Sequence, residues 1–179
     1  MIAEDEALQL VRKTSKYDHA LVVATLMEKL AATLNENEQE WKLVGLLHDL
    51  DYDEVVNEMK RHGIVSAERL KGKLPEHCIH AIMVHDHRTG LTPKSRLDKA
   101  LIAADTVASL IEKTETQIEK LEVDALRVKL ENASLGQSWY KSNLMQVEEI
   151  GLRLEDFLHL CLDVLKTTKS TKNSNPRRY

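Results

Sequence analysis

Residues 45–53 read GLLHDLDYD, and this stretch decides how the rest of the chain is interpreted. It ends a predicted helix in which Trp41, Val44 and Leu47 are spaced to lie on one buried side. His48 follows Val44 by four residues and Trp41 by seven, so its imidazole is predicted to lie on that side too. A helix core normally excludes a lone imidazole, because burying it without a partner is costly. The stretch therefore predicts a helix with an unusual polar site at its end.

Two more ionisable residues lie within apolar helical patterns. His19 shares its predicted face with the apolar residues three, four and seven positions later. Asp105 ends the run ALIAAD at residues 100–105, which otherwise has the composition of a buried core. One buried histidine is commonplace, but several buried ionisable groups on different helices need a common partner. A divalent cation is the simplest such partner, and a buried His–Asp hydrogen-bond network is the alternative.

Together these residues resemble the H…HD…D pattern of the HD superfamily. The pattern is present in order, as His19, the adjacent pair His48-Asp49 and the distal Asp105, with apolar flanks. The resemblance covers about residues 16–111 and says little about the C-terminal third. It implies an all-α fold, a compact HD-domain helical bundle, in which these four residues hold a divalent metal.

Two further histidines resemble ligands of HD proteins that hold two metals. His62 in MKRHGIVSAERL is similar to an HG…A..L segment, and His85 in HAIMVHDHRTG resembles an A-I-x-x-H segment. The resemblance then implies that Asp49 bridges to a second metal bound by His62 and His85. His87 is the alternative to His85, because two helical residues so spaced point in nearly opposite directions, and we favour His85. Iron or manganese suits such a bridged centre, whereas a single ion could also be Mg, Co, Zn or Ni.

The resemblance also implies a reaction. The majority activity of the superfamily is metal-dependent hydrolysis of phosphate esters, often of nucleotides. We therefore expect an enzyme that attacks a small phosphorylated substrate through a metal-bound water. Asp51 and Asp53 are candidates to position that water or to accept its proton, and helix capping is their favoured alternative role.

Several cationic residues near the pattern could hold the phosphate. Arg88 is the first candidate, because it lies in the loop directly after the histidines; the others are Lys60, Arg61, Lys94 and Arg96. Many HD phosphohydrolases follow the HD pair with I-G-K, whereas this chain reads Leu50-Asp51-Tyr52. The departure concerns substrate recognition and leaves the metal ligands unaffected.

Two other functions stay open at this point. Some diiron HD proteins are oxygenases that cleave C–C or C–P bonds with dioxygen, and they share the same ligands. Such an enzyme needs iron and consumes oxygen, whereas a hydrolase works anaerobically with Mn or Mg. The third reading is a non-catalytic, metal-binding regulatory module, and the presence of the whole ligand pattern argues against it.

The composition indicates long helices. The chain has 179 residues, of which 42% are hydrophobic, with 6 Gly and 3 Pro. We predict one HD-type helical domain over residues 1–165, with a C-terminal helical extension. The predicted helices span residues 2–14, 18–34, 39–50, 53–61, 65–70, 75–85, 96–130 with a break near Thr114, and 139–166.

Charge and the remaining features narrow the partners. Residues 166–179 hold five basic residues and no acid, which leaves 20 basic against 29 acidic residues in the body. Such a body is a poor binder of nucleic acid, and we expect the basic tail to be disordered. Cys78 and Cys161 lack metal-type spacing. No apolar window resembles a signal peptide or a membrane span, so we expect a cytoplasmic protein without a membrane partner. The long helices after Arg96 could support a homodimer.

Overall fold

The structure is a computed structural model that describes residues 1–113 and 121–174, with the backbone alone over 168–174. Its helices are α1 (Glu4–Val11), α2 (Tyr17–Leu34), α3 (Glu38–Leu47), α4 (Tyr52–Val55), η1 (Met59–Arg61), α5 (Ile64–Leu70), α6 (Glu76–Val84), η2 (His87–Thr89), α7 (Arg96–Glu112), α8 (Val123–Gly136), α9 (Trp139–Glu149) and α10 (Leu154–Ser174). No strand occurs within the described ranges, so the all-α prediction is confirmed.

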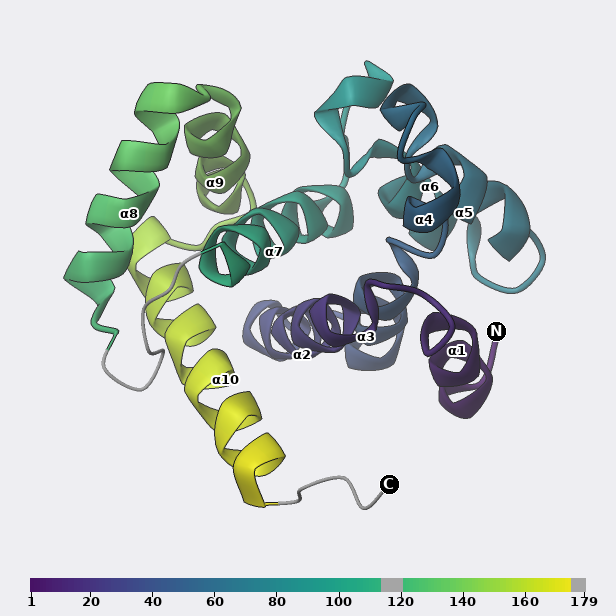
Figure 1. Cartoon of the computed structure of the whole chain (residues 1–179), viewed down its shortest axis with the longest axis horizontal. Coiled ribbons are helices and arrows are strands. Elements are labelled where there is room, and N and C mark those ends of the chain that lie inside the picture. The colour runs from purple at the N-terminus through teal and green to yellow at the C-terminus, as the bar shows by residue number, and fades with distance from the viewer. Residues whose placement is uncertain (114–120, 175–179) are drawn as a thin grey trace.

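Helices α2 and α3 form a closely packed pair near the middle of the molecule, next to α7 (Figure 1). Asn35 ends α2 in the left-handed conformation, with φ 56°, and Asn37 caps α3 through its side chain. Gly45 lets the two backbones approach, because a Cβ there would lie 2.8 Å from the Val23 carbonyl oxygen. The close approach brings the end of α3 beside the start of α2.

Helix α7 runs through the middle of the molecule (Figure 1) and is buried on most of its circumference. It contacts α2 and α6 on one side and α9 on the other. A capping box starts it: the Ser95 hydroxyl accepts from the Asp98 backbone N–H, and the Asp98 carboxylate accepts from the Ser95 N–H. The helical pattern predicted over 96–130, with a break near Thr114, corresponds to α7 and α8, and residues 114–120 lie outside the described residues.

Helices α8, α9 and α10 extend the same core past α7. Helix α9 packs along α7, and α10 runs back beside α2 (Figure 1). Their inward side chains, among them Leu126, Leu144 and Phe157, belong to the same buried apolar cluster as the N-terminal helices. The predicted C-terminal helical extension is confirmed.

Two predicted boundaries differ in the structure. The expected helix over 53–61 is divided into α4 and η1, because Val55, Val56 and Asn57 are weak helix formers and the chain turns to bury Val55. Helix α10 continues to Ser174, into the segment for which we expected disorder. Residues 166–174 contain no Gly or Pro, so the helix can continue until the approach to Pro176. Residues 175–179 lie outside the described part of the chain.

Among the described helices, none combines the length and the apolar composition that crossing a membrane requires.

Candidate metal centre

Five separate segments bring six ionisable side chains to one place. His19 comes from the first turn of α2, and Asp105 from the middle of α7. The other four stand at or just after helix ends: His48 and Asp49 after α3, His62 after η1, and His85 after α6. The four histidines and Asp49 are at most 5% exposed, and the side chain of Asp105 is 25% exposed. The cluster is therefore largely withdrawn from water.

One half of the cluster surrounds Asp105. His19 Nε2 lies 3.0 Å from Asp105 Oδ1, and His48 Nε2 lies 3.8 Å from the same oxygen. Asp49 closes this half, with Oδ1 3.3 Å from His48 Nε2 and Oδ2 3.7 Å from His19 Nε2. These spacings leave room for one ion to replace the direct contacts.

The other half of the cluster shares Asp49. Its Oδ1 atom lies 3.0 Å from His62 Nε2 and 3.6 Å from His85 Nε2. The two imidazole nitrogens are 3.2 Å apart. The Asp49 carboxylate thus stands between two groups of nitrogen donors, which is the position of a bridging ligand.

Partners outside the cluster fix the tautomer of each histidine. The Nδ1–H groups of His48 and His85 donate to the carbonyl oxygens of Gly45 and Ile82, at 2.8 Å and 2.7 Å. The Nδ1–H group of His62 donates to Asp51 Oδ1 at 2.9 Å, and that of His19 donates to Glu112 Oε1 at 2.9 Å. With Nδ1 protonated, each neutral imidazole turns an Nε2 lone pair toward the cluster, which is the arrangement that orients metal-bound histidines.

These lone pairs have too few donors to satisfy them. His48 Nε2 is buried and has no hydrogen-bond partner among the described residues. His62 Nε2 and His85 Nε2 face each other at 3.2 Å, and a donor lies between them only while one of the two rings is protonated. An unpartnered buried nitrogen carries a desolvation cost, and coordination to a cation removes it. The donor set therefore fits a divalent metal.

The pKa values of these histidines and aspartates reflect an excess of negative charge in the cluster. Burial opposes protonation of His19, but hydrogen bonds to Asp105 and Glu112 outweigh it and raise the pKa of His19 to about 10. Burial also opposes protonation of His62, and hydrogen bonds to Asp49 and Asp51 raise its pKa to about 9. Conversely, burial favours the neutral acid at Asp49 and Asp105, yet the neighbouring histidines hold the pKa of both carboxyls well below the usual value. Both carboxylates therefore stay charged, and His19 and His62 carry the balancing positive charge when no metal is bound.

Gly63 allows His85 and the segment after η1 to meet. Its φ is +78°, a conformation that side chains with a Cβ rarely adopt. A Cβ at this position would lie 2.8 Å from His85 Nδ1 and would also collide with the Ile82 carbonyl oxygen. The glycine after His62 is therefore required by the close packing of the second half of the cluster.

Asp51 and Asp53, the candidates for helix capping or for positioning a water, do not line the cavity described below. Asp51 is fully buried; one oxygen accepts from His62 Nδ1–H and the other from the Ser66 backbone N–H at 2.9 Å. Asp53 is exposed and accepts from the backbone N–H and the hydroxyl of Ser15. Neither side chain caps α4. Asp51 orients a histidine and Asp53 fastens the start of α2, because the turn after α3 directs both carboxylates away from the cavity.

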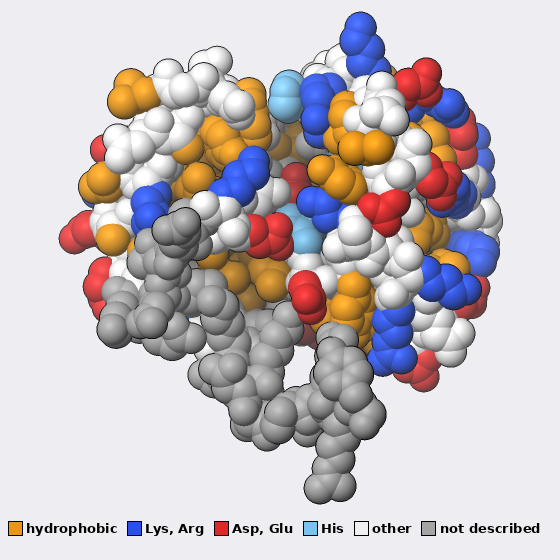
Figure 2. All heavy atoms as spheres, in the orientation of Figure 1, with side chains coloured by type: hydrophobic (Ala, Val, Ile, Leu, Met, Phe, Trp, Pro, Cys, Tyr) orange, Lys and Arg blue, Asp and Glu red, His pale blue; other side chains and the backbone are white. Residues whose placement is uncertain are grey.

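The cluster lies at the wall of a cavity of about 450 Å³. The cavity is lined by Lys16, Asp49, Tyr52, His62, His85, Asp86, His87, Arg88, Asp105, Ser109, Glu112, Lys113, Gln137, Trp139 and Asn143. Figure 2 shows this face as a furrow in which acidic, basic and histidine side chains gather. One wall belongs to α9 and the residues just before it, so the C-terminal helices help to enclose the site.

The predicted phosphate contacts divide between this cavity and other surfaces. Arg88 lines the cavity, but its guanidinium is paired with Asp86, with Nε 2.9 Å and 3.1 Å from the two carboxylate oxygens. Lys60 and Arg61 line a neighbouring pocket that shares Arg88 with the cavity, and Arg96 pairs with Glu36. The remaining candidate, Lys94, is not among the residues that line the cavity.

His87, the alternative to His85, stands at the rim. Its side chain is 46% exposed and its ring stacks on Trp139, with the ring centroids 4.9 Å apart. The structure thus brings His85 into the cluster and leaves His87 outside it.

Sequence reasoning missed several residues of the site. Glu112, which is the Nδ1 partner of His19, was not singled out. It lies seven residues after Asp105 on α7 and belongs to no motif. Lys16 and Trp139 were missed because their closeness to the cluster depends on how distant segments pack. The spacing of Lys16, three residues before His19, was the available signal, since residues so spaced share a helix face.

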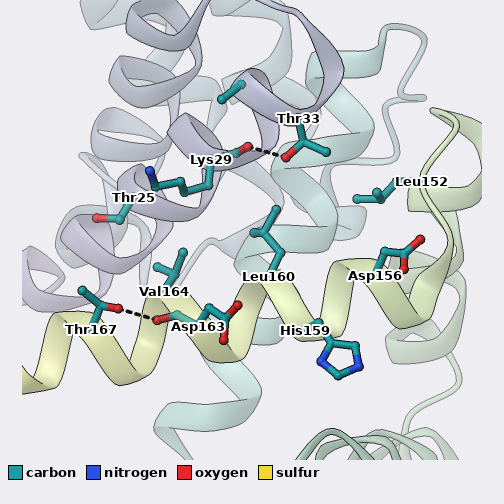
Figure 3. A pocket seen from close by; sticks show the side chains of 11 residues that line it. Thr25, Lys29, Thr33, Leu152, Asp156, His159, Leu160, Asp163, Val164 and Thr167 are labelled. Atoms are coloured by element: carbon teal, nitrogen blue, oxygen red, sulfur yellow. Dashed lines mark hydrogen bonds between the residues drawn. The ribbon is translucent and has the colours of Figure 1, made fainter.

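A larger groove of about 1060 Å³ lies elsewhere, between α2 and α10 (Figure 3). Thr25 and Thr33 line it from α2, and His159 and Leu160 line it from α10. Both threonine hydroxyls donate to carbonyl oxygens of their own helix. Size alone would select this groove, but the cluster of ionisable groups lies in the smaller cavity.

Comparison with known proteins gives one match. The family model described as HD domain matches residues 17–117, which is more than half of the chain and includes all six residues of the cluster. No curated protein and no solved structure matches. HD domains bind divalent metals, and this agrees with the donor set described above. The chain therefore belongs to the HD domain family.

Proposed function

We propose that this protein is a metal-dependent phosphohydrolase that cleaves a small phosphate ester. The observation that carries the proposal is the cluster of four histidines and two aspartates, four of whose members line a cavity that also presents ammonium groups. A cavity of about 450 Å³ has the size of a small-molecule site. Membership of the HD domain family, in which metal-dependent hydrolases are frequent, supports the same reaction class.

Two ions would divide the cluster along the geometry already described. His19, His48, Asp49 and Asp105 would hold the first ion. His62 and His85 would hold the second, with Asp49 shared between them. When bound, such ions neutralise phosphate oxygens and lower the pKa of a coordinated water, which supplies the nucleophile. Asp51 and Glu112 keep the imidazoles of His62 and His19 oriented through their Nδ1 atoms.

The charge of the cavity makes metal a condition for binding an anion. Four carboxylates line it, from Asp49, Asp86, Asp105 and Glu112, against the three cations Lys16, Arg88 and Lys113. With neutral imidazoles the lining is therefore net negative, and protonation of His62, whose pKa is raised to about 9, only brings it to neutral. A divalent ion bound to neutral imidazoles makes the lining net positive. We expect an anionic substrate to bind after the metal.

The test begins with the metal content of untagged protein purified without chelator. Two ions per chain support the shared-carboxylate arrangement, and one ion supports the first site alone. The metal-loaded protein is then assayed anaerobically with Mn or Mg against a panel of phosphate monoesters that includes nucleoside monophosphates. Phosphate release that chelator abolishes is the expected result. Turnover that requires iron and dioxygen, without phosphate release, would overturn the proposal in favour of an oxygenase.

A matched pair of variants ties the activity to the cluster. His48→Ala should abolish both metal retention and phosphate release. His77→Ala is the control, because His77 is an exposed histidine whose recorded partner is Glu40, away from the cavity. If both variants retain activity equally, the cluster is not the site of the reaction.

A further inference from the structure

The side chain of Lys16 occupies the mouth of the metal centre. Its Nζ atom lies 4.0 Å from Asp49 Oδ2, which is beyond hydrogen-bonding distance. The same atom lies 4.1 Å from the centroid of the Tyr52 ring, in the geometry of a cation–π contact. The side chain is 22% exposed and lines the cavity. The ammonium group is therefore held in place while its N–H donors still face the open space.

The residues around Lys16 are arranged to hold it there. Asp53 accepts hydrogen bonds from both the backbone N–H and the hydroxyl of Ser15, the preceding residue. Tyr52 supplies the ring beneath the ammonium. Asp51, next to them, fixes His62. Three consecutive residues after the His48-Asp49 pair thus position one metal-centre histidine and one lysine.

The other cations of the cavity have different partners. Arg88 forms a two-pronged pair with Asp86, which lies two residues before it in the chain. Lys113 Nζ donates to the Tyr140 hydroxyl at 3.3 Å and pairs with no carboxylate among the described residues. Lys16 is the cavity lysine that stands beside a metal-centre carboxylate, with Nζ 4.0 Å from Asp49 Oδ2. Within the described residues its Nζ makes no hydrogen bond, so its N–H donors are available to a ligand.

We infer that Lys16 anchors the anionic phosphoryl group of the substrate beside the metal centre, with Tyr52 and Asp53 as the residues that position it. The inference rests on the proposed function and names the residue that would select a doubly charged phosphate monoester. An ammonium is a compact donor of three N–H groups, which suits oxygens that must also remain accessible to a metal. The competing role for Lys16 is to neutralise Asp49 alone, without any contact with a ligand.

The experiment measures binding of inorganic phosphate to Mn-loaded, full-length protein by calorimetry. Lys16→Met removes the ammonium, and Lys16→Arg restores a positive charge. Lys13→Met is the matched control, because Lys13 is exposed, lies three residues earlier and does not line the cavity. We expect Lys16→Met to weaken phosphate binding about tenfold or more, Lys16→Arg to recover part of it, and Lys13→Met to leave it unchanged. Bound Mn per chain should stay the same in all three.

The readouts separate this inference from the proposed function. If the wild type binds phosphate through Lys16 but hydrolyses no ester, the hydrolase proposal fails and the anion site stands. If Lys16→Met binds phosphate like the wild type, or lowers the Mn content instead, the anchor is refuted and Lys16 serves Asp49. Tyr52→Leu keeps the charge but removes the ring that holds it. It should weaken phosphate binding by a smaller factor, with the helical circular dichroism preserved, and an unchanged affinity would contradict the positioning role.

Discussion

The metal-centre cavity and the groove between α2 and α10 differ in whether their polar side chains already have hydrogen-bond partners. The groove is the larger, at about 1060 Å³ against about 450 Å³. Yet its threonine hydroxyls are satisfied by their own helices, whereas His48 Nε2 in the cluster is buried without a hydrogen-bond partner. Buried groups that distant segments bring together without satisfying one another are a stronger mark of function than volume. Variants in both regions can test this difference.

The largest expected effect is the complete loss of metal. The double variant His48→Ala with Asp49→Ala removes a donor from the first half of the cluster and the carboxylate shared by both halves. We expect no bound metal by elemental analysis, with the helical circular dichroism largely intact. Metal that survives this change would show that the ligand assignment is wrong.

Gly63→Ala should disturb the cluster through the backbone. The substitution places a Cβ at a φ of +78°, against His85 and the Ile82 carbonyl, and we expect a loss of about 3 kcal/mol of stability. Gly72→Ala is the control, because Gly72 has a similar φ of +76° but nothing within 4 Å of the added Cβ. It should cost about 1 kcal/mol. Equal losses in urea unfolding of the two variants would mean that packing against His85 contributes nothing.

Asp51→Asn should lower the affinity for the metal without removing a ligand. The amide can accept from only one of the two donors that now share the carboxylate, His62 Nδ1–H and Ser66 N–H. We expect a loss of about 10- to 100-fold in metal affinity, measured by competition with a chelator. Asp53→Asn changes the same chemical group two residues later, outside the cluster, and should leave metal affinity as it is.

Asp98→Asn tests a buried carboxylate that belongs to neither region. Burial would raise the pKa of Asp98, but hydrogen bonds from Ser95, Lys94 and His80 outweigh it and hold the pKa below 3.8. A depressed folded-state pKa stabilises the protein above the unfolded-state value, and that contribution disappears as the pH falls through the folded-state value. The variant should therefore be about 1 kcal/mol less stable at neutral pH, with unchanged metal content. In chemical unfolding, the difference in stability between the wild type and Asp98→Asn should become smaller below pH 3.8.

His159→Ala should have the smallest effect. His159 is an exposed residue of the groove in Figure 3, and its loss should change stability by less than about 0.5 kcal/mol. Metal content and phosphate release should match the wild type. A clear drop in activity would give the groove a part in the reaction and would weaken the contrast drawn above.

The sequence predicted what depends on local periodicity. The helical positions of His19, His48 and Asp105 follow from their place in apolar stripes, and the structure brings all three together. The sequence could not show where side chains point after a helix ends, because helical periodicity does not extend into a turn. Asp51 and Asp53 were therefore candidates either for helix capping, which we favoured, or for positioning a water, whereas one supports His62 and the other holds Ser15.

Contacts between distant segments were equally hidden. Trp139 reaches the cavity only because α9 packs along α7, and no pattern within residues 134–149 indicates this contact. Tyr52 stands where many HD phosphohydrolases carry a lysine, and Lys16, from another segment, lies over its ring. The sequence does not indicate this contact, because the two residues are far apart along the chain.

The donors of the metal centre and the α9 side of the cavity come from different parts of the chain. All six donors of the metal centre precede residue 113, whereas Gln137, Trp139 and Asn143 come from a segment beyond the matched family region. The reactive chemistry and the shape of the entrance are therefore encoded in different stretches of the chain. Exposed side chains of α9 that face the cavity could therefore change the shape of the entrance without altering any of the six donors.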